Sequence, residues 1–182
     1  EELEKQMKEA AKNLEFEKAA LIVFDAHLDS ESVNGLHHEA FNRELVQSGA
    51  ITPDRLMIIG ARKFSQQEQA FAKENGIKII RASEINTGLP AAQRSLSDFV
   101  SANSNIYASM DIDFFDPRLA PGTSAREGNG VKEYEAMELL GEIINSGRLR
   151  AFDLVEINPI LDKGGRTVAL GKKVMEKLFA EW

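Results

Sequence analysis

Carboxylate and imidazole side chains alternate directly after the apolar run ALIVF (20–24), where DAHLD contributes Asp25, His27 and Asp29. Within an extended segment, residues at positions i and i+2 point to the same side of the chain. A buried strand that ends in this pattern can therefore present two or three ligand atoms to one ion. Carboxylate oxygens and imidazole nitrogens are both common metal ligands in proteins.

Two later apolar runs also end in acidic residues. The segment SMDIDFFDP (109–117) contains Asp111, Asp113 and Asp116, and the segment VEINP (155–159) contains Glu156. In open α/β sheets, ligands bind at the carboxyl ends of the strands. The acids of the first and second motifs can form one cluster only if their two strands are neighbours in the sheet.

The residue types of these motifs favour a metal site. Carboxylates held close together cannot all ionise at low cost without cations between them, because their repulsion raises their pKa values. A mixed carboxylate and imidazole set suits manganese, iron or zinc, whereas oxygen ligands alone favour magnesium or calcium. Two metals about 3.5–4 Å apart would lower the pKa of a bridging water. A single acidic pair after a strand is also a common turn or cap device, but three such motifs together favour a metal.

The elements that position these motifs are predicted by short apolar runs alternating with helical patterns. Runs rich in β-branched residues predict strands buried on both faces, as in a parallel sheet covered by helices: 20–24, 55–60, 77–80, 105–110 and 152–157. Helices are expected at 37–48, 65–75, 90–102, 131–146 and 165–181, and Gly49, Gly76 and Gly147 stand near the ends of three of them. The pattern predicts a three-layer α/β/α fold with a mostly parallel sheet.

The N-terminal residues 1–20 have a different pattern, that of an amphipathic helix. Apolar residues recur there at helical spacing: Leu3, Met7, Ala10, Ala11 and Leu14. The only change of composition along the chain falls near residue 20. We therefore expect an N-terminal helix, followed by one α/β domain over residues 21–182.

Composition narrows the classes of partner. The 182 residues carry a formal charge of -7, which argues against nucleic acid and anionic membranes as partners and favours a cationic ligand. The sequence contains no cysteine, which excludes disulfides and thiolate zinc sites and fits a reducing compartment. No apolar run approaches the roughly 18 residues of a membrane span, and the acidic N-terminus is no secretory signal. A cytoplasmic location is expected.

Taken in order, DAHLD (25–29), SMDIDFFDP (109–117), APGT (120–123) and VEINP (155–159) resemble the signature segments of the ureohydrolase family. That family comprises arginase, agmatinase and formimidoylglutamase, binuclear manganese enzymes that hydrolyse guanidino or amidino groups. The resemblance covers residues 21 to about 180. It implies a truncated arginase-like fold, a small cationic guanidino substrate, and hydrolysis that releases urea and an amine.

The resemblance also implies metal-ligand roles. Asp25 and Asp111 match the carboxylates that bridge two Mn²⁺ ions, and His27 and Asp113 match ligands of one ion. Asp29 matches a ligand of the other ion and the residue that passes a proton to the departing amine.

Two further residues match groups that act on the substrate. Glu156 matches the acid that holds the guanidinium group, and His37 stands where the family has a proton-shuttling histidine. The match at His37 is looser, because the family usually has glycine next and this sequence has His38.

One part of the family pattern is missing. Family members carry an earlier Gly-Gly-Asp-His motif whose histidine completes one of the two metal sites. All three histidines of this sequence lie at or after DAHLD. The resemblance leaves the second ion with Asp25, Asp29 and Asp111 only. Weaker binding of that ion, and reduced or lost catalysis, are therefore expected.

In place of the family's N-terminal strands, residues 1–20 read EELEKQMKEAAKNLEFEKAA, which resembles the first helix of the UVR motif. That helical hairpin mediates protein contacts in the bacterial nucleotide-excision nuclease. An alternative function follows, a non-catalytic metal-binding or protein-interaction scaffold in which this helix docks a partner or a second copy of the chain. An unrelated amphipathic helix is the other interpretation of the segment.

Overall fold

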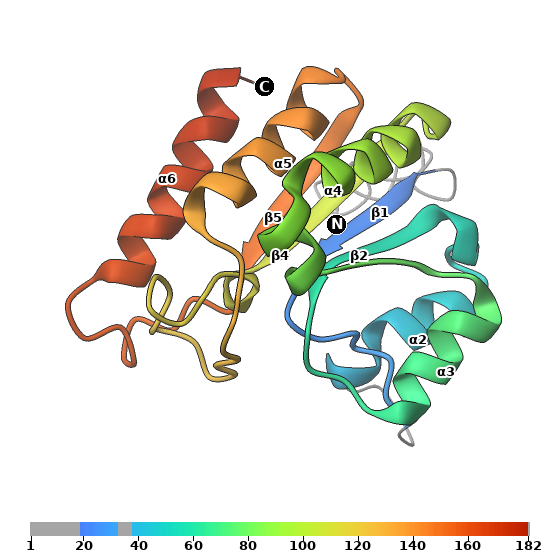
Figure 1. Cartoon of the computed structure of the whole chain (residues 1–182), viewed down its shortest axis with the longest axis horizontal. Helices are drawn as coiled ribbons and strands as arrows, with labels where there is room; N and C mark the ends of the chain where they lie inside the picture. Colours follow the sequence, from blue (N-terminus) through green and yellow to red (C-terminus); the bar gives the residue numbers. More distant parts are fainter. Residues whose placement is uncertain (1–18, 33–37, 182) are drawn as a thin grey trace, which may run out of the picture.

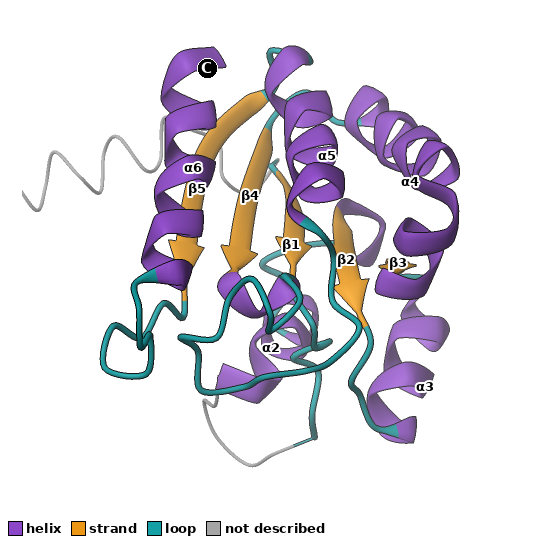
Figure 2. Cartoon of the chain, turned by 60° about the vertical axis from the view of Figure 1, so that its left-hand side comes forward, coloured by secondary structure: helices purple, strands orange, loops and turns teal. Residues whose placement is uncertain are grey.

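The computed structural model describes residues 19–32 and 38–181, and its centre is a parallel sheet of five strands. The strand order is β3-β2-β1-β4-β5 (Figure 2). The strands are β1 (Ala20–Phe24), β2 (Leu56–Ala61), β3 (Lys78–Arg81), β4 (Ile106–Asp111) and β5 (Leu149–Val155). Each predicted strand is present, and the parallel sheet is confirmed.

Helices lie on both sides of this sheet, as Figures 1 and 2 show. Helices α4 (Ala82–Ala102), α5 (Glu133–Asn145) and α6 (Arg166–Glu181) cover one face. The opposite face carries α2 (Phe41–Gln47) and α3 (Gln66–Asn75). The predicted three-layer α/β/α fold is therefore confirmed. The helix predicted for residues 1–20 lies almost entirely outside the described residues.

Strand β1 shows why its apolar run is continuous. Ile22 and Phe24 belong to the core beneath α4, α5 and α6, whereas Leu21 and Val23 belong to the core shared with α3. Every residue of β1 is buried, because successive side chains of a strand enter the two cores in turn. A strand with one face in water would have alternated apolar and polar residues instead.

Two element boundaries differ from the sequence prediction. Helix α4 begins at Ala82, well before the predicted start at residue 90, and it contains a kink at Gly88. Proline is favoured in the first turn of a helix, so Pro90 indicated that a helix begins there. In the structure, Pro90 instead lies in the first turn of the second part of α4, after the kink. Strand β5 ends at Val155, which places Glu156 in the loop beyond the strand.

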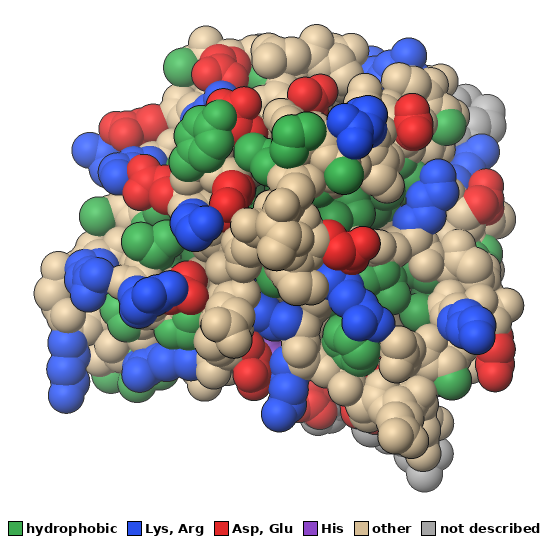
Figure 3. Space-filling view, in the orientation of Figure 1, with side chains coloured by type: hydrophobic (Ala, Val, Ile, Leu, Met, Phe, Trp, Pro, Cys, Tyr) green, Lys and Arg blue, Asp and Glu red, His purple; other side chains and the backbone are tan. Residues whose placement is uncertain are grey.

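The surface carries charges of both signs. On the face shown in Figure 3, Lys and Arg side chains lie among Asp and Glu side chains, with hydrophobic side chains between them. Over the described residues, no helix combines the length and the apolar character needed to cross a membrane.

Gly60, near the end of β2, allows the sheet to approach the turn after β4. Its φ is +102°, and a Cβ there would lie 2.3 Å from Cδ2 of Phe114. Gly60→Ala is expected to lower the free energy of unfolding by about 2 kcal/mol, from backbone strain plus overpacking. Urea unfolding measures this cost.

Gly128→Ala is the matched control, since a Cβ at Gly128 meets nothing within 4 Å. Its free energy of unfolding should stay within about 0.5 kcal/mol of the parent value. Equal losses in the two variants would contradict the steric argument.

Candidate metal centre

The adjacency of β1 and β4 brings the first two acidic motifs together. The two strands pair in parallel, with Phe24 opposite Met110, so their carboxyl ends meet at one edge of the sheet. Asp25 and His27 follow β1 directly, and Asp113 lies in a 3₁₀ turn, η4 (Ile112–Phe114), after β4. The condition that the sequence left open, neighbouring strands, is met.

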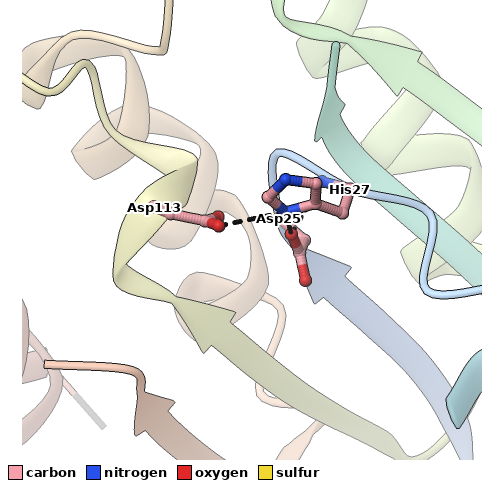
Figure 4. A group of neighbouring side chains, drawn as sticks. All are labelled: Asp25, His27 and Asp113. Atoms are coloured by element: carbon pink, nitrogen blue, oxygen red, sulfur yellow. Dashed lines mark hydrogen bonds and ion pairs between the residues drawn. The ribbon is translucent and has the colours of Figure 1, made fainter. Parts of the chain in front are cut away.

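Three side chains converge at this edge (Figure 4). Nδ1 of His27 lies 3.0 Å from Oδ2 of Asp113 and 3.2 Å from Oδ1 of Asp25. One ligand atom from each residue falls within 4.8 Å of the others. Among the described residues, this is the group of His and acidic side chains that could hold a metal ion.

Backbone amides fix the two carboxylates. The amide of Ala26 donates to Oδ1 of Asp113 at 3.1 Å, and the amide of His27 donates to Oδ1 of Asp25 at 2.7 Å. The amide of Asp113 in turn donates to Oδ1 of Asp111 at 2.8 Å. Outer hydrogen bonds of this kind orient metal ligands, so the carboxylates are held in place before any ion arrives.

The electrostatics of the group reflect crowded acids around one imidazole. Hydrogen bonds to Asp113 and Asp25 raise the pKa of His27 to about 10. Burial raises the pKa of Asp25, and burial together with the neighbouring Asp113 raises the pKa of Asp111. Burial also raises the pKa of Asp29, to about 8. Positive charge is therefore favoured here, and the imidazolium supplies it in the metal-free chain.

The donor set fits a divalent cation. An ion about 2.1–2.2 Å from each donor holds neighbouring donors about 3 Å apart, which is the spacing observed around Nδ1 of His27. One imidazole with two carboxylates suits manganese, iron or zinc. Asp25, His27 and Asp113 are thus the residues of this structure that would hold the ion.

A cavity of about 820 Å³ opens beside this group, a size that suits a small-molecule ligand. Asp29, Asp111 and Glu156 line it together with the three converging residues. All sequence-predicted site residues except His37 therefore line one cavity, but Asp29, Asp111 and Glu156 are not members of the converging group. His37 lies outside the described residues, whereas His38 lines the cavity.

Two of the cavity residues have unusual backbone conformations. Asp29 has φ 45° and Glu156 has φ 63°. Both values lie in the left-handed region of the backbone, which residues other than glycine rarely adopt. Such strain is tolerated where the surrounding structure enforces it, and it is concentrated at functional sites. Glu156 directly follows the end of β5.

The chain matches the arginase family over residues 5–180. It belongs to that family.

Individual arginase-family proteins agree with this assignment. The chain is 26% identical to an arginase of Bacillus subtilis over 91% of its own length and 62% of the relative's length. It is 32% identical to a guanidinopropionase of Pseudomonas aeruginosa, over 87% of this chain and 52% of the relative. The structure superposes on formimidoylglutamase from B. subtilis with a TM-score of 0.82 and 26% identity, covering 88% of this chain and 52% of that one. The chain thus spans between half and two thirds of the length of these relatives.

The arginase-family match also bears on the N-terminal segment. It begins at residue 5 and so includes most of the segment that resembled a UVR helix. No comparison supports the UVR resemblance. Residues 1–18 lie outside the described part of the chain, so their docking role and the domain boundary near residue 20 stay predictions.

Three residues near the candidate metal centre had no sequence pattern that indicated a place in the site. Oε1 of Glu127 lies 4.0 Å from Nε2 of His27, although its loop has no periodic pattern. Glu68 is buried, and its Oε1 accepts a hydrogen bond from the amide of Ser30 at 3.1 Å. Ser30 directly follows Asp29 in the sequence. Its place in a capping box, SQQE, was readable, but its nearness to the cavity was not. Arg62, at the end of β2, is the third.

Proposed function

We propose that the chain is a manganese-dependent hydrolase of guanidino or amidino compounds, of the arginase or agmatinase type, that releases urea and an amine. The convergence of Asp25, His27 and Asp113 beside a cavity lined by acids carries this proposal. A small cationic guanidino compound is the natural occupant, because carboxylates dominate the charged groups of that lining.

Each chemical role falls on a residue of the cavity. Manganese at this position would make hydroxide available at neutral pH. The oxygen of the hydroxide bonds to the guanidino carbon of the substrate. The bond from that carbon to the alkyl-bearing nitrogen then breaks. Asp29 takes the proton from that oxygen and delivers it to the departing nitrogen, so urea and a neutral amine leave. Glu156 orients the substrate cation so that the carbon faces the nucleophile.

A second ion would rely on Asp29 and Asp111 in addition to Asp25. All three are carboxylates, and without a histidine this set has one protein ligand fewer than the four that the resemblance implies for the first ion. We propose that the second ion binds more weakly than the first. His37 is proposed as the proton shuttle, because it stands where the family has a proton-shuttling histidine.

Metal content and urea release test the proposed function together. The chain is loaded with Mn²⁺, desalted and assayed for metal by mass spectrometry, then offered arginine, agmatine and guanidino acids with manganese in excess. Urea from any of these compounds, lost on chelation, supports the proposal. Bound metal with no urea from the panel favours the non-catalytic scaffold instead. A chain that binds no manganese overturns the hydrolase and the metal-binding scaffold, and leaves the protein-interaction scaffold.

Glu156→Gln tests the substrate role separately from the metal. The exchange removes the negative charge but keeps the size of the side chain, whose Oε2 lies 3.4 Å from Oγ of Ser124. Losing one charge-assisted hydrogen bond should weaken binding of agmatine about 10–100-fold, measured by calorimetry on the manganese-loaded chain. Manganese content should be unchanged. A variant that binds agmatine normally contradicts the assigned role.

A further inference from the structure

The side chain of Arg62 lies where three segments of the metal centre meet. Within the described residues, its guanidinium contacts six backbone carbonyl oxygens at hydrogen-bonding distance, so at least one N–H is shared between two carbonyls. The shortest run from Nη2 to the carbonyl of Asp113 at 2.6 Å and to that of Glu127 at 2.9 Å. Nη1 donates to the carbonyl of Gly60, in β2, at 3.2 Å. One rigid group therefore joins the end of β2, the turn after β4 and the loop at residue 127.

The backbone of Arg62 completes a hydrogen-bond network that includes the candidate ligand residues. Its amide donates to the carbonyl of Ala26 at 2.8 Å, and Ala26 lies between Asp25 and His27. The amide of Ala26 donates to Oδ1 of Asp113 at 3.1 Å, and the carbonyl of Asp113 accepts from Nη2 of Arg62. Both ligand-bearing segments are thus tied to one arginine and, through its backbone and side chain, to each other.

The chemistry of arginine suits this task. A guanidinium has five N–H donors in a planar fork, whereas the ammonium of lysine is a compact point charge on a flexible stem. The ammonium has its three donors on one nitrogen, whereas the fork spreads five donors over three nitrogens and so reaches more carbonyls of fixed direction at once. Arg62 is also partly buried, so these carbonyls have few alternative partners. The positive charge would in addition offset part of the acidity of the centre.

We propose that Arg62 is a positioning residue of the metal centre, which holds the Asp25–His27 segment and the Asp113 turn at the separation that one ion requires. Arg62 makes no contact of its own with the ligand atoms of the three converging residues, so it acts through their backbones. The positioning stands on these hydrogen bonds alone, and its consequence for manganese rests on the proposed function.

The matched control for this proposal is Arg148, which lies at the opposite end of the strands. Its Nη1 likewise donates to three backbone carbonyls, those of Val100, Ser101 and Asn103. Arg148 precedes β5, so these bonds lie away from the carboxyl ends that carry the metal centre. Lysine at either position keeps the charge and removes the fork, so a purely structural loss should be similar for both.

The test compares Arg62→Lys and Arg148→Lys in the full chain by two measurements. The first is amide hydrogen exchange of Ala26 in the metal-free state, corrected for any change in the global free energy of unfolding. The second is the Kd for Mn²⁺. Arg62→Lys is expected to accelerate exchange of Ala26 and to raise the Kd about 10–100-fold, the usual effect of losing an outer partner of a metal site. Arg148→Lys should change neither.

Each other outcome overturns the proposal. Unchanged exchange of Ala26 in Arg62→Lys, an unchanged Kd with faster exchange, or equal effects in the two variants would each show that Arg62 is structural only. If Arg62→Lys does not fold, Arg62→Gln, which keeps two donors, takes its place in both measurements. If the parent chain binds no manganese, the proposed function fails, and exchange of Ala26 alone decides the positioning role.

Discussion

Asp113→Asn is expected to raise the Kd for Mn²⁺ at least about 100-fold, because loss of an outer partner of a ligand already costs 10–100-fold. Oδ2 of Asp113 lies 3.0 Å from Nδ1 of His27, within the converging group. An amide oxygen carries no full negative charge and is a poorer ligand for a divalent cation. Oδ1 of the asparagine can still accept the amide of Ala26, so the fold should be retained.

The measurement is a manganese titration of the metal-free chain, read by the shift in melting temperature and by calorimetry. Manganese at 100 times its Kd should stabilise the parent chain by about 2.7 kcal/mol. That corresponds to a rise in Tm of roughly 5–10 °C for a chain of this size. The same manganese concentration should leave the Tm of Asp113→Asn nearly unchanged.

Asp116→Asn is the matched control for this prediction. Asp116 belongs to the same acidic motif, but it pairs with Arg118 at 2.7 Å and is not a member of the converging group. Its replacement should leave the Kd for manganese within about threefold of the parent value. Equal losses in the two variants would mean that general acidity attracts the ion, and not a particular set of ligands.

Phe114→Ala is expected to lower the free energy of unfolding by about 3–5 kcal/mol, the usual cost of removing a buried aromatic side chain. The ring is fully buried and meets Phe24 edge to face, with centroids 5.2 Å apart. It also meets Phe115 in the same manner at 5.5 Å. Asp113 and Phe114 belong to the same 3₁₀ turn, η4, so loss of the ring also loosens the turn that carries a candidate ligand.

Urea unfolding of the metal-free chain measures this loss, and Tyr134→Ala is its control. Tyr134 is also aromatic, but 67% of its surface is exposed, so its removal should cost less than about 0.5 kcal/mol. Phe114→Leu should lie between the two, because leucine refills part of the cavity. A loss below about 1 kcal/mol in Phe114→Ala would contradict a packed core at this position.

Local sequence was sufficient to predict the existence of the strands and of most helices, and it indicated the candidate ligands. The run from Ala20 to Phe24 predicted a buried strand because both faces of a covered parallel strand need apolar residues. Gly76 predicted the end of a helix, and it has the left-handed backbone of a cap, with φ 71°. The DAHLD spacing predicted ligands because residues Asp25 and His27 share one side of an extended segment.

Tertiary structure alone decided which of these parts meet. No local pattern states that β4 lies beside β1, because strand order depends on crossovers and on how the two cores pack. That adjacency brings Asp113 next to His27, although 86 positions separate residues 27 and 113 in the sequence. The separation of Asp29, Asp111 and Glu156 from the converging group also follows from three-dimensional geometry, and not from residue type.

By itself, the sequence determined the fold class, because that depends on periodicity and local spacing, and its motifs carried the arginase-family resemblance and the candidate ligands. Only the tertiary structure decided that Asp25, His27 and Asp113 form one centre and that Arg62 ties their segments together. The physical reason is that hydrogen bonds between side chains and distant carbonyls leave no periodic trace. An arginine after a strand has the same local pattern whether it points into water or joins three loops.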